Sequence, residues 1–563
     1  MAVSAFVDID TLPQANSGTA TLTEASFGTV DAGVMIFNRA NTATQVGQTG
    51  AAVGVAFWDG TNDSSNAVSF EHGLGTTNTQ RENSTTNVFY DHSGSLNYGV
   101  TSATDGVTIT KTSGTTGVDR YVSGFFLAGL TNKASGTVDL GTGTSEVTVS
   151  GLGFDPNLVI LMNVGDATLN NSATPAIFSL GFANKDGGGT ISQGCIFLGS
   201  EHNVGTSSSY SRISNTAACG QVFQDALSWD GEVTTFGTGS FGITPSSSAS
   251  NDKVYYLAIE LPNADDSHIA LIDAATSTGN DAHTGFGFQP EMIFAASENN
   301  TTIDTMHTEL SFMFGMSDST TTSCEYFRDE DAVDTTNTAS SHSTNFIQLE
   351  SDSGTTDAVA TVSSFDSDGV TLNYSDAAAA ADKILIFSVG DSAGTGTTIN
   401  ANTDTLVLTG QNANINAATD IDANTDTLVL TGQTANINAA TNISANSDAL
   451  VLTGNTSTVK LSVNVNANTD PLILTGQNAT ITTGNDTNIN ANTDNLVLTG
   501  QTASVQFATN ISANTDTLTL TGQTATIYEG FDGITIDGQQ RVLITADYGD
   551  LKLYFNGESY FTL

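Results

Sequence analysis

Four acidic side chains lie close together in the sequence, at Glu325, Asp329, Glu330 and Asp331. Paired carboxylates can cleave glycosidic bonds, one acting as a general acid and the other as a base or nucleophile. The cluster therefore leaves open a polysaccharide-degrading enzyme. A chain with 59 acidic residues carries many acidic loops without a catalytic role, and we favour that interpretation. We expect no catalytic residues.

Two short motifs resemble ligand-binding loops but lack essential parts. Gly237 to Gly242 read G-T-G-S-F-G and match G-x-G-x-x-G, yet the flanking runs predict strands, whereas a dinucleotide site needs a helix there. Asp366 to Gly369 read D-S-D-G, like half of a calcium loop, but position 12 of that loop would be Ala377 and not Glu. We therefore expect neither a nucleotide cofactor nor an EF-hand.

Two acid–histidine pairs, Glu71-His72 and Glu201-His202, fall at similar places in the first and second of three repeats described below. We interpret them as a shared, solvated loop and not as a metal or catalytic site. The chain has three cysteines, at Cys195, Cys219 and Cys324. A pair between the first two would leave the third alone, and we favour three small core residues. No Cys/His cluster with zinc spacing appears.

Composition favours a large all-β chain. Its 563 residues suffice for three or more domains, and Gly, Thr, Ser, Asn and Asp are abundant while helix formers are few. The net charge of −46 argues against nucleic acid and anionic membranes as partners. The first ten residues show no signal-peptide pattern, and no run approaches 18 apolar residues, so we expect no membrane insertion.

Three long repeats can be traced by landmarks that recur in the same order. An opening of the type G-F-x-P followed by an apolar run occurs at 151–160 and 285–294, with a looser copy near Phe27-Gly28. A Gly/Phe-rich run ending in an acidic turn follows at 53–60, 178–187 and 310–319, and each unit closes on an apolar run. Short strands separated by turns predict a β-sandwich. We place three tandem sandwich domains at 1–135, 136–265 and 266–394.

A shorter repeat fills residues 395–528. The segment A-N-T-D-T-L-V-L-T-G-Q begins at Ala401 and recurs five times, with spacings of 22, 22, 22, 24 and 22 residues. Alternation places Leu406, Leu408, Ala413 and Ile415 on one face of the predicted strands. One copy cannot bury a core, so copies must stack as a β-solenoid or as an intertwined trimer, of which we favour the trimer. Residues 529–563 predict a β cap with a hairpin at Asn556-Gly557.

An aspartate recurs at the same turn of every short repeat. These aspartates are Asp404, Asp426, Asp448, Asp470, Asp494 and Asp516. A ladder of Ca²⁺ sites is one interpretation, because hard cations bind carboxylate oxygens. We favour capping of the turn backbone instead, since no repeat carries a second fixed acid. The presence of metal is left open.

The repeats resemble virion structural proteins of tailed bacteriophages, especially marine ones. The T-L-V-L-T-G-Q-N-A-N-I units at 405–415, the terminal L-K-L-Y-F-N-G-E-S-Y-F-T-L at 551–563 and the G-F-x-P-x-x-V-I opening at 153–160 carry this resemblance. It covers most of the chain. It implies a place on the surface of a virus particle, other virion proteins as partners, and a structural or host-attachment role, with no catalytic residues.

We therefore expect a homo-oligomeric fibre or spike on tail or capsid that binds host glycans through several weak sites. Trp58, Phe57 and Tyr90 are candidate glycan contacts, although core packing is the commoner role of aromatic residues. The alternatives are a capsid decoration protein without a receptor, a polysaccharide-degrading tailspike and a bacterial surface adhesin.

Overall fold

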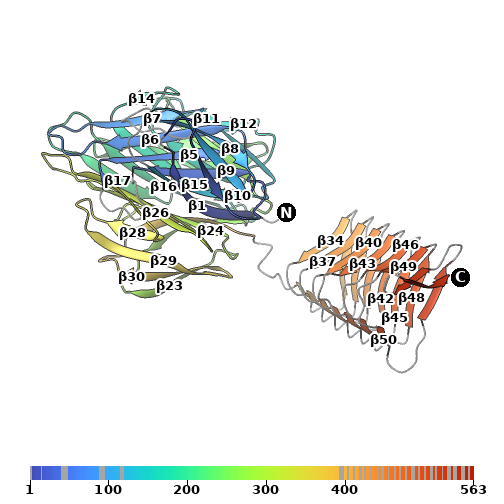
Figure 1. Ribbon diagram of the computed structural model, residues 1–563. Coiled ribbons are helices and arrows are strands. Elements are labelled where there is room, and N and C mark those ends of the chain that lie inside the picture. Colours follow the sequence, from blue (N-terminus) through green and yellow to red (C-terminus); the bar gives the residue numbers. More distant parts are fainter. Residues whose placement is uncertain are drawn as a thin grey trace. The chain divides into compact units, whose positions relative to one another are not determined.

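The computed structural model describes residues 3–13, 15–39, 48–87, 96–114 and 120–391, and the strands between residues 399 and 562. The chain forms two compact units, Met1–Ser392 and Ala393–Leu563, which we call the head and the solenoid (Figure 1). Every regular element of the described residues is a β-strand, so the expected all-β class is confirmed. These residues contain no helix able to cross a membrane.

The head contains three sandwiches, each made of a larger and a smaller antiparallel sheet. In the first, the larger sheet has the order β1 (Ser4–Leu12), β10 (Arg120–Ala128), β3 (Ala32–Asn38), β5 (Ala51–Trp58), β6 (Asp63–Phe70), β7 (Thr79–Ser84). Its smaller sheet has the described strands β2 (Thr19–Thr23), β9 (Gly106–Ser113) and β8 (Asn97–Ala103).

The second and third sandwiches repeat this order with a four-stranded smaller sheet. The second has β11 (Asn132–Asp139), β21 (Lys253–Glu260), β13 (Leu158–Asn163), β15 (Ala176–Lys185), β16 (Ile191–Ser200), β17 (Ser209–Ser214), and β12 (Val147–Ser150), β20 (Ser240–Pro245), β19 (Ala226–Gly237), β18 (Cys219–Phe223). The third has β22 (Ser267–Asp273), β31 (Lys383–Val389), β24 (Met292–Ser297), β25 (Leu310–Asp318), β26 (Thr322–Asp329), β27 (Thr338–Ser343), and β23 (Gly279–Thr284), β30 (Gly369–Asp376), β29 (Thr356–Asp366), β28 (Ile347–Glu350).

One predicted boundary between the sandwiches is misplaced. The division at 135/136 cuts β11, which pairs along its whole length with β21 of the second sandwich. The first sandwich therefore ends with β10 at Ala128, and the second begins at Asn132. The error arises because β11 is polar and lacks the apolar run that marks the other strands of the sheet.

The larger sheets are buried on both faces, which explains their continuous apolar runs. Along β13, Leu158, Ile160 and Met162 join one apolar cluster, while Val159 and Leu161 join another. The second of these clusters lies between the two sheets of the second sandwich. The first cluster gathers residues from all three sandwiches, and we call it the central core.

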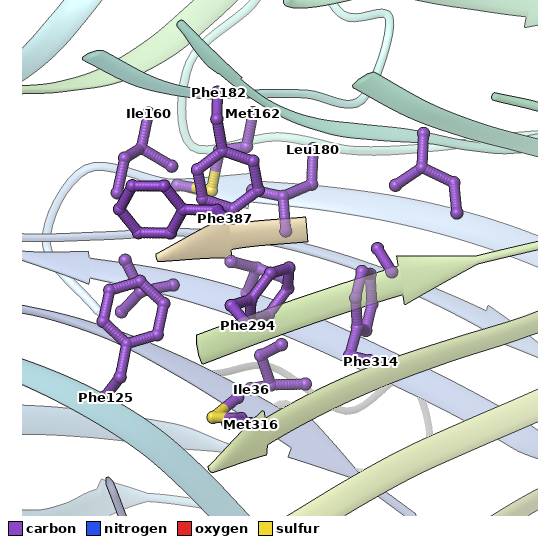
Figure 2. Packing of buried hydrophobic residues seen from close by; sticks show 14 of the residues in the cluster. Ile36, Phe125, Ile160, Met162, Leu180, Phe182, Phe294, Phe314, Met316 and Phe387 are labelled. Atoms are coloured by element: carbon purple, nitrogen blue, oxygen red, sulfur yellow. The ribbon is translucent and has the colours of Figure 1, made fainter. Parts of the chain in front are cut away.

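Aromatic rings from the three sandwiches meet in the central core (Figure 2). Phe182 of the second sandwich stacks on Phe387 of the third, with ring centroids 4.7 Å apart and planes inclined by 14°. Phe125 of the first lies 5.9 Å from Phe387 and 6.0 Å from Phe294. Burying a large apolar side chain contributes about 1.5–3 kcal/mol. The three sandwiches are thus joined by a shared core. Independent tandem domains would each have only a core of their own.

The solenoid winds one coil per short repeat, and each coil contributes one strand to each of three parallel sheets. The first sheet contains β32 (Ile399–Ala401), β35 (Ile421–Ala423), β38 (Ile443–Ala445), β41 (Val465–Ala467), β44 (Ile489–Ala491), β47 (Ile511–Ala513) and β50 (Ile534–Ile536). The second contains β33 (Thr405–Thr409), β36 (Thr427–Thr431), β39 (Ala449–Thr453), β42 (Pro471–Thr475), β45 (Asn495–Thr499), β48 (Thr517–Gly522) and β51 (Val542–Ala546).

The third sheet of the solenoid ends in an antiparallel strand. It contains β34 (Asn412–Ala417), β37 (Thr434–Ala439), β40 (Thr456–Leu461), β43 (Asn478–Thr483), β46 (Thr502–Gln506), β49 (Thr524–Tyr528), β52 (Lys552–Phe555) and β53 (Glu558–Thr562). Strands β52 and β53 pair antiparallel as predicted, and the turn predicted at Asn556-Gly557 lies outside the described residues. The predicted end of the repeats at 528 is too early, because β50, β51 and β52 continue the three sheets as another coil.

The described strands stack as a solenoid within one chain and not as the intertwined winding that we favour from the sequence. Each strand pairs in parallel with the equivalent strand one repeat further along the same chain, as in Leu406 with Leu428. Backbone groups of successive coils therefore satisfy one another within one chain.

Candidate functional site

Polar contacts between the three sandwiches recur in three equivalent sets. The first set involves a residue within one position of the end of β5, β15 or β25, close to the acidic turn noted in the sequence. The Asp59 carboxylate of the first sandwich accepts hydrogen bonds from the backbone N–H (3.0 Å) and the hydroxyl (2.8 Å) of Ser135 in the second. The other interfaces have Asn184 Nδ2 donating to Ser267 O at 2.9 Å and Val7 N donating to Asp318 Oδ2 at 2.6 Å.

A second set of contacts extends the edge of each larger sheet with backbone from the next sandwich. The short strand β14 (Ser172–Ala173) of the second sandwich pairs with β7 of the first. In the same way β4 (Gln48–Thr49) of the first pairs with β27 of the third. At the remaining interface His307 of the third forms an isolated bridge with Ser211 in β17 of the second. Covering these edges satisfies backbone groups that would otherwise be free to pair.

The third set uses the loops at 71–78, 201–208 and 330–337, which include the two acid–histidine pairs. His202 Nδ1 accepts a 3.2 Å hydrogen bond from the backbone N–H of Thr79 at the start of β7. The equivalent acceptors are His72 Nδ1 for Thr338 N at 3.1 Å and Asp331 Oδ1 for Ser209 N at 2.9 Å. The prediction of a shared loop is therefore correct, but both histidines are engaged by the neighbouring sandwich and are not merely solvated.

A hydroxyl in each loop adds a further repeated contact. Thr336 Oγ1 accepts a 2.9 Å hydrogen bond from Leu74 N, and its backbone N–H donates to Leu74 O. Thr77 with Val204 and Ser207 with Val333 repeat both bonds at the other interfaces. Because the first sandwich contacts the second, the second the third, and the third the first through matching positions, the head is an internal ring with pseudo-threefold symmetry.

The ring closes at the interface between the third and first sandwiches, where Glu325 is fully buried. Its carboxylate accepts hydrogen bonds from Asn38 Nδ2 (2.7 Å) and Ser123 Oγ (2.8 Å), both in the first sandwich. Nε2 of His342, in the same sandwich, lies 3.6 Å from Glu325 Oε1. The His342 ring stacks on the ring of Tyr121. Burial raises the pKa of Glu325, while His342 and the two donors oppose that rise.

The interface between the second and third sandwiches contains a different polar set. Arg212 is almost buried, forms ion pairs with Asp230 (3.1 Å) and Asp304 (2.9 Å), and lies over the ring of Phe197. Glu298 is buried beside it, and its Oε1 lies 3.9 Å from His307 Nε2 of its own sandwich. Burial raises the pKa of Glu298 to about 8, while Ser211, Ile213 and Arg212 oppose that rise.

The interface between the first and second sandwiches is joined by neutral and cationic donors. The Tyr255 hydroxyl donates to Asn83 Oδ1 at 2.9 Å, and Arg81 Nη1 donates to the carbonyl of Pro175 at 2.8 Å. Burial raises the pKa of the adjacent Glu82 to about 9. The three interfaces thus share their backbone contacts but differ in their buried polar side chains.

The acidic cluster predicted as a possible catalytic pair is built into these interfaces. Asp329 is buried, accepts a 2.6 Å hydrogen bond from Ser200 Oγ of the second sandwich, and has its pKa raised to about 7 by burial. Glu330 accepts a bond from Asn337 within its own loop. Of the four acids of the cluster, Glu325 and Asp329 are buried between sandwiches, whereas Glu330 and Asp331 are partly exposed in their loop.

The remaining sequence candidates also have structural places. Gly237 is the last residue of β19 and Gly242 lies within β20. These two strands form a hairpin, in which Gly237 pairs with Ser240. Asp366 accepts hydrogen bonds from Ser364 and Thr371, while Asp368 accepts them from the backbone of Gly285 and Gly287 in the G-F-x-P opening. Both acids therefore stabilise turns of the third sandwich.

The core role of the cysteines is confirmed, since all three are buried and unbridged. Phe57 is buried in the central core and Trp58 in the first sandwich's own core, so core packing, the commoner role expected of them, is confirmed for both and neither is a glycan contact. Tyr90 and the six turn aspartates lie outside the described residues. Within the part of the chain that is described, no group of three or more His, Cys, Asp or Glu side chains is placed to hold a metal ion.

Comparison with known proteins adds no assignment: no protein-family model matches the chain, and no curated protein matches it. The function of the chain is therefore inferred below from the interfaces between the sandwiches and from the polar contacts within them. Sequence reasoning missed Thr79, Ser209 and Thr338 as partners of the loops, although each is a hydroxyl residue at the same position of its repeat.

Proposed function

We propose that this chain is a non-enzymatic structural protein of a virus particle, a fibre or spike that is attached to tail or capsid and aids contact with host surface glycans. The observation that carries the proposal is the closed ring of sandwiches. Four of the candidates for chemistry, Glu325, Asp329, His72 and His202, join one sandwich to another. Such a use of polar residues suits a protein whose task is to keep its shape.

The two units suit different parts of this role. Parallel coils spaced about 4.8 Å apart make the solenoid an extended spacer. The head presents three similar sandwiches, so three similar outer surfaces face the surroundings. Weak sites on such surfaces gain strength when they bind one polymeric ligand together, because the second and third contacts become intramolecular. Host glycans offer repeated units of this kind.

Cryo-electron microscopy of intact particles tests the proposal. Particles carrying the full chain are compared with particles whose chain ends at residue 392, which lack the solenoid. We expect a projecting density on particles with the full chain, and the part of that density that belongs to the solenoid should be missing from particles whose chain ends at residue 392. Absence of any density for the chain on purified particles would contradict a virion role.

Glycan-array binding by the purified full chain separates the versions of this role. Binding that grows with glycan density supports attachment. Tight incorporation into the capsid without glycan binding would assign a decoration protein instead, and loss of polymer viscosity would assign a depolymerase.

A further inference from the structure

The backbone contacts between the sandwiches are alike at all three interfaces, so they do not determine which sandwich pairs with which. In each, a hydroxyl accepts a hydrogen bond from a backbone N–H of the neighbouring loop, and Thr77, Ser207 and Thr336 supply these hydroxyls. Identical sandwiches from different copies of the chain would offer one another the same groups. The order of the ring must therefore be set by side chains that differ between the interfaces.

One pair of buried side chains differs completely among the three sandwiches. It lies on the last two strands that each sandwich contributes to its larger sheet, four residues beyond the first residue of β7, β17 or β27. The paired residues are opposite each other in the sheet and are all buried: Asn66 and Asn83 in the first sandwich, Ile196 and Ile213 in the second, Glu325 and His342 in the third. The same place thus holds two amides, two aliphatic side chains, or an acid and an imidazole.

The neighbouring sandwich meets each pair with one side chain from β10, β21 or β31. Ser123 of the first sandwich donates a 2.8 Å hydrogen bond from its hydroxyl to Glu325 of the third. The hydroxyl of Tyr255 in the second donates to Asn83 Oδ1 of the first at 2.9 Å. Both polar pairs are therefore met by a hydroxyl group that donates to them.

At the interface between the second and third sandwiches the same positions are apolar. Leu385 of the third and Ile196 and Ile213 of the second are fully buried members of the central core. Leu385 packs closely against β16, because a Cβ added at Gly194 would overlap its Cδ1. These three side chains carry no hydrogen-bonding group. Each pair is thus met by a side chain that suits it, and we call the three combinations the matched sets.

We propose that the matched sets decide which sandwich pairs with which, and that they exclude rings of second or of third sandwiches taken from different copies of the chain. In a ring of third sandwiches, Leu385 would face Glu325, whose buried carboxyl would lose the donor of Ser123. In a ring of second sandwiches, Tyr255 would face Ile213, and its hydroxyl would be buried without its acceptor. Specificity is the difference in free energy between such pairings and the native ones.

The consequence is a head that closes within one chain even when many copies fold close together. A third sandwich and the first sandwich of another copy also form a matched set. The connections within one chain raise the effective concentration of its own sandwiches and favour them over those of other copies. Side chains therefore select the partner face, and connections select the copy. The inference goes beyond the proposed function and does not depend on it.

Replacing a whole matched set in the full chain tests the proposal. Glu325→Ile, His342→Ile and Ser123→Leu together give the closing interface the aliphatic set. Replacing all partners by apolar groups costs little, whereas replacing one leaves the others buried without it. The triple variant should therefore melt at a higher temperature than Glu325→Ile alone. It should also melt above the double variant His342→Ile with Ser123→Leu, which is equally apolar at those two positions but keeps Glu325. A triple variant that melts below both overturns the proposal.

A second set provides the same test if the larger side chain of Ser123→Leu prevents folding. Tyr255→Leu with Asn66→Ile and Asn83→Ile gives the aliphatic set to the interface between the first and second sandwiches, and the smaller leucine offsets the larger isoleucines. This triple variant should melt above Tyr255→Leu alone. Equal or greater destabilisation would show that the three positions do not act as a set.

Refolding at increasing concentration tests the exclusion of other copies. Glu325→Ile with His342→Ile gives the third sandwich a pair that suits Leu385 of another copy. This variant should form species heavier than 58.0 kDa, whereas the wild type refolds at 58.0 kDa. Ile196→Val with Ile213→Val is the matched control, because it keeps the aliphatic set, and it should refold like the wild type. A Glu325→Ile, His342→Ile variant that refolds entirely at 58.0 kDa contradicts the proposal.

Discussion

Glu325 in the third sandwich accepts a 2.7 Å hydrogen bond from Asn38 in the first, although 287 residues separate them. Both side chains are buried. Since the first and third sandwiches are the two ends of the head in sequence, this bond lies where the ring closes. The other two interfaces join sandwiches that are adjacent in the chain and are held in proximity by short connections. The closing interface has no such help and depends on contacts alone.

Replacing Glu325 with alanine should therefore destabilise the head. The change removes the acceptor of the Ser123 hydroxyl and one of the two acceptors of Asn38 Nδ2, which keeps its bond to the Ser341 carbonyl. An unsatisfied buried donor costs about 1–3 kcal/mol. Thermal unfolding can be followed by the fluorescence of Trp58 and Trp229, the two tryptophans of the chain, because both are buried in the head. Glu232→Ala, at an exposed position, is the control. Equal melting temperatures for the two variants would contradict a structural role for Glu325.

Glu298 should make the head less stable as the pH rises. Burial raises its pKa from an ordinary value of 4.5 to about 8, so between these values the native state holds a proton that the unfolded chain releases. Stability from this group is fully present below pH 4.5 and is lost as the pH approaches 8. The slope contributed is at most about 1.4 kcal/mol per pH unit.

Glu298→Gln removes this titration while keeping the shape of the side chain. Unfolding free energies measured from pH 5 to 8 should fall less steeply for this variant than for the wild type. Glu232→Gln serves as the control because its carboxyl is exposed. An unchanged slope in Glu298→Gln would show that the buried carboxyl does not titrate in this way.

The loop contacts can be tested with a substitution that the chain itself suggests. His72 accepts a hydrogen bond from Thr338 N, and Asp331 has the equivalent place at another interface. His72→Ala removes the acceptor and should cost about 1 kcal/mol, whereas His72→Asp should retain most of the stability. Denaturant unfolding followed by tryptophan fluorescence measures both. If aspartate is no better than alanine, the two positions are not equivalent.

The cysteines should be inert in the folded chain. All three are buried, and burial raises the pKa of Cys195 and Cys219 well above the usual range of a thiol. A thiol reagent should therefore label no cysteine in the native protein and three after denaturation. Reducing agent should leave the melting temperature unchanged. Labelling of fewer than three thiols in denaturant would indicate a bridge.

The strands of the sandwiches were predictable because their environment leaves a mark on the sequence. The run L-V-I-L-M-N of β13 is apolar at successive positions, since one face meets the central core and the other the sandwich core. The sequence does not show which other sandwich packs against each buried face. Nothing near His72 indicates that Thr338 lies beside it, because the contact depends on the mutual placement of whole sandwiches.

The solenoid shows a different limit of the sequence. Identical repeats stacked in register predict ladders such as Leu406 beside Leu428. Stacking along one chain and winding among three chains bury the same apolar alternation, so the repeat alone does not separate them. The strands β4 and β14, which extend the sheet of a neighbouring sandwich, are two residues long, too short to show a periodic pattern in the sequence.

The central claim is that three sandwiches share one core and unfold as one unit. Phe387 of the third sandwich contacts Phe182 of the second and Phe125 of the first, so Phe387→Ala removes a ring that all three share. Such a change in a core costs about 3–5 kcal/mol. Hydrogen exchange of the full chain, measured peptide by peptide, compares the variant with the wild type.

We predict that β3, β13 and β24, one strand from each sandwich, lose protection together and by the same free energy. Faster exchange confined to β24 and its neighbours in the third sandwich, with β3 and β13 unchanged, would contradict the shared core.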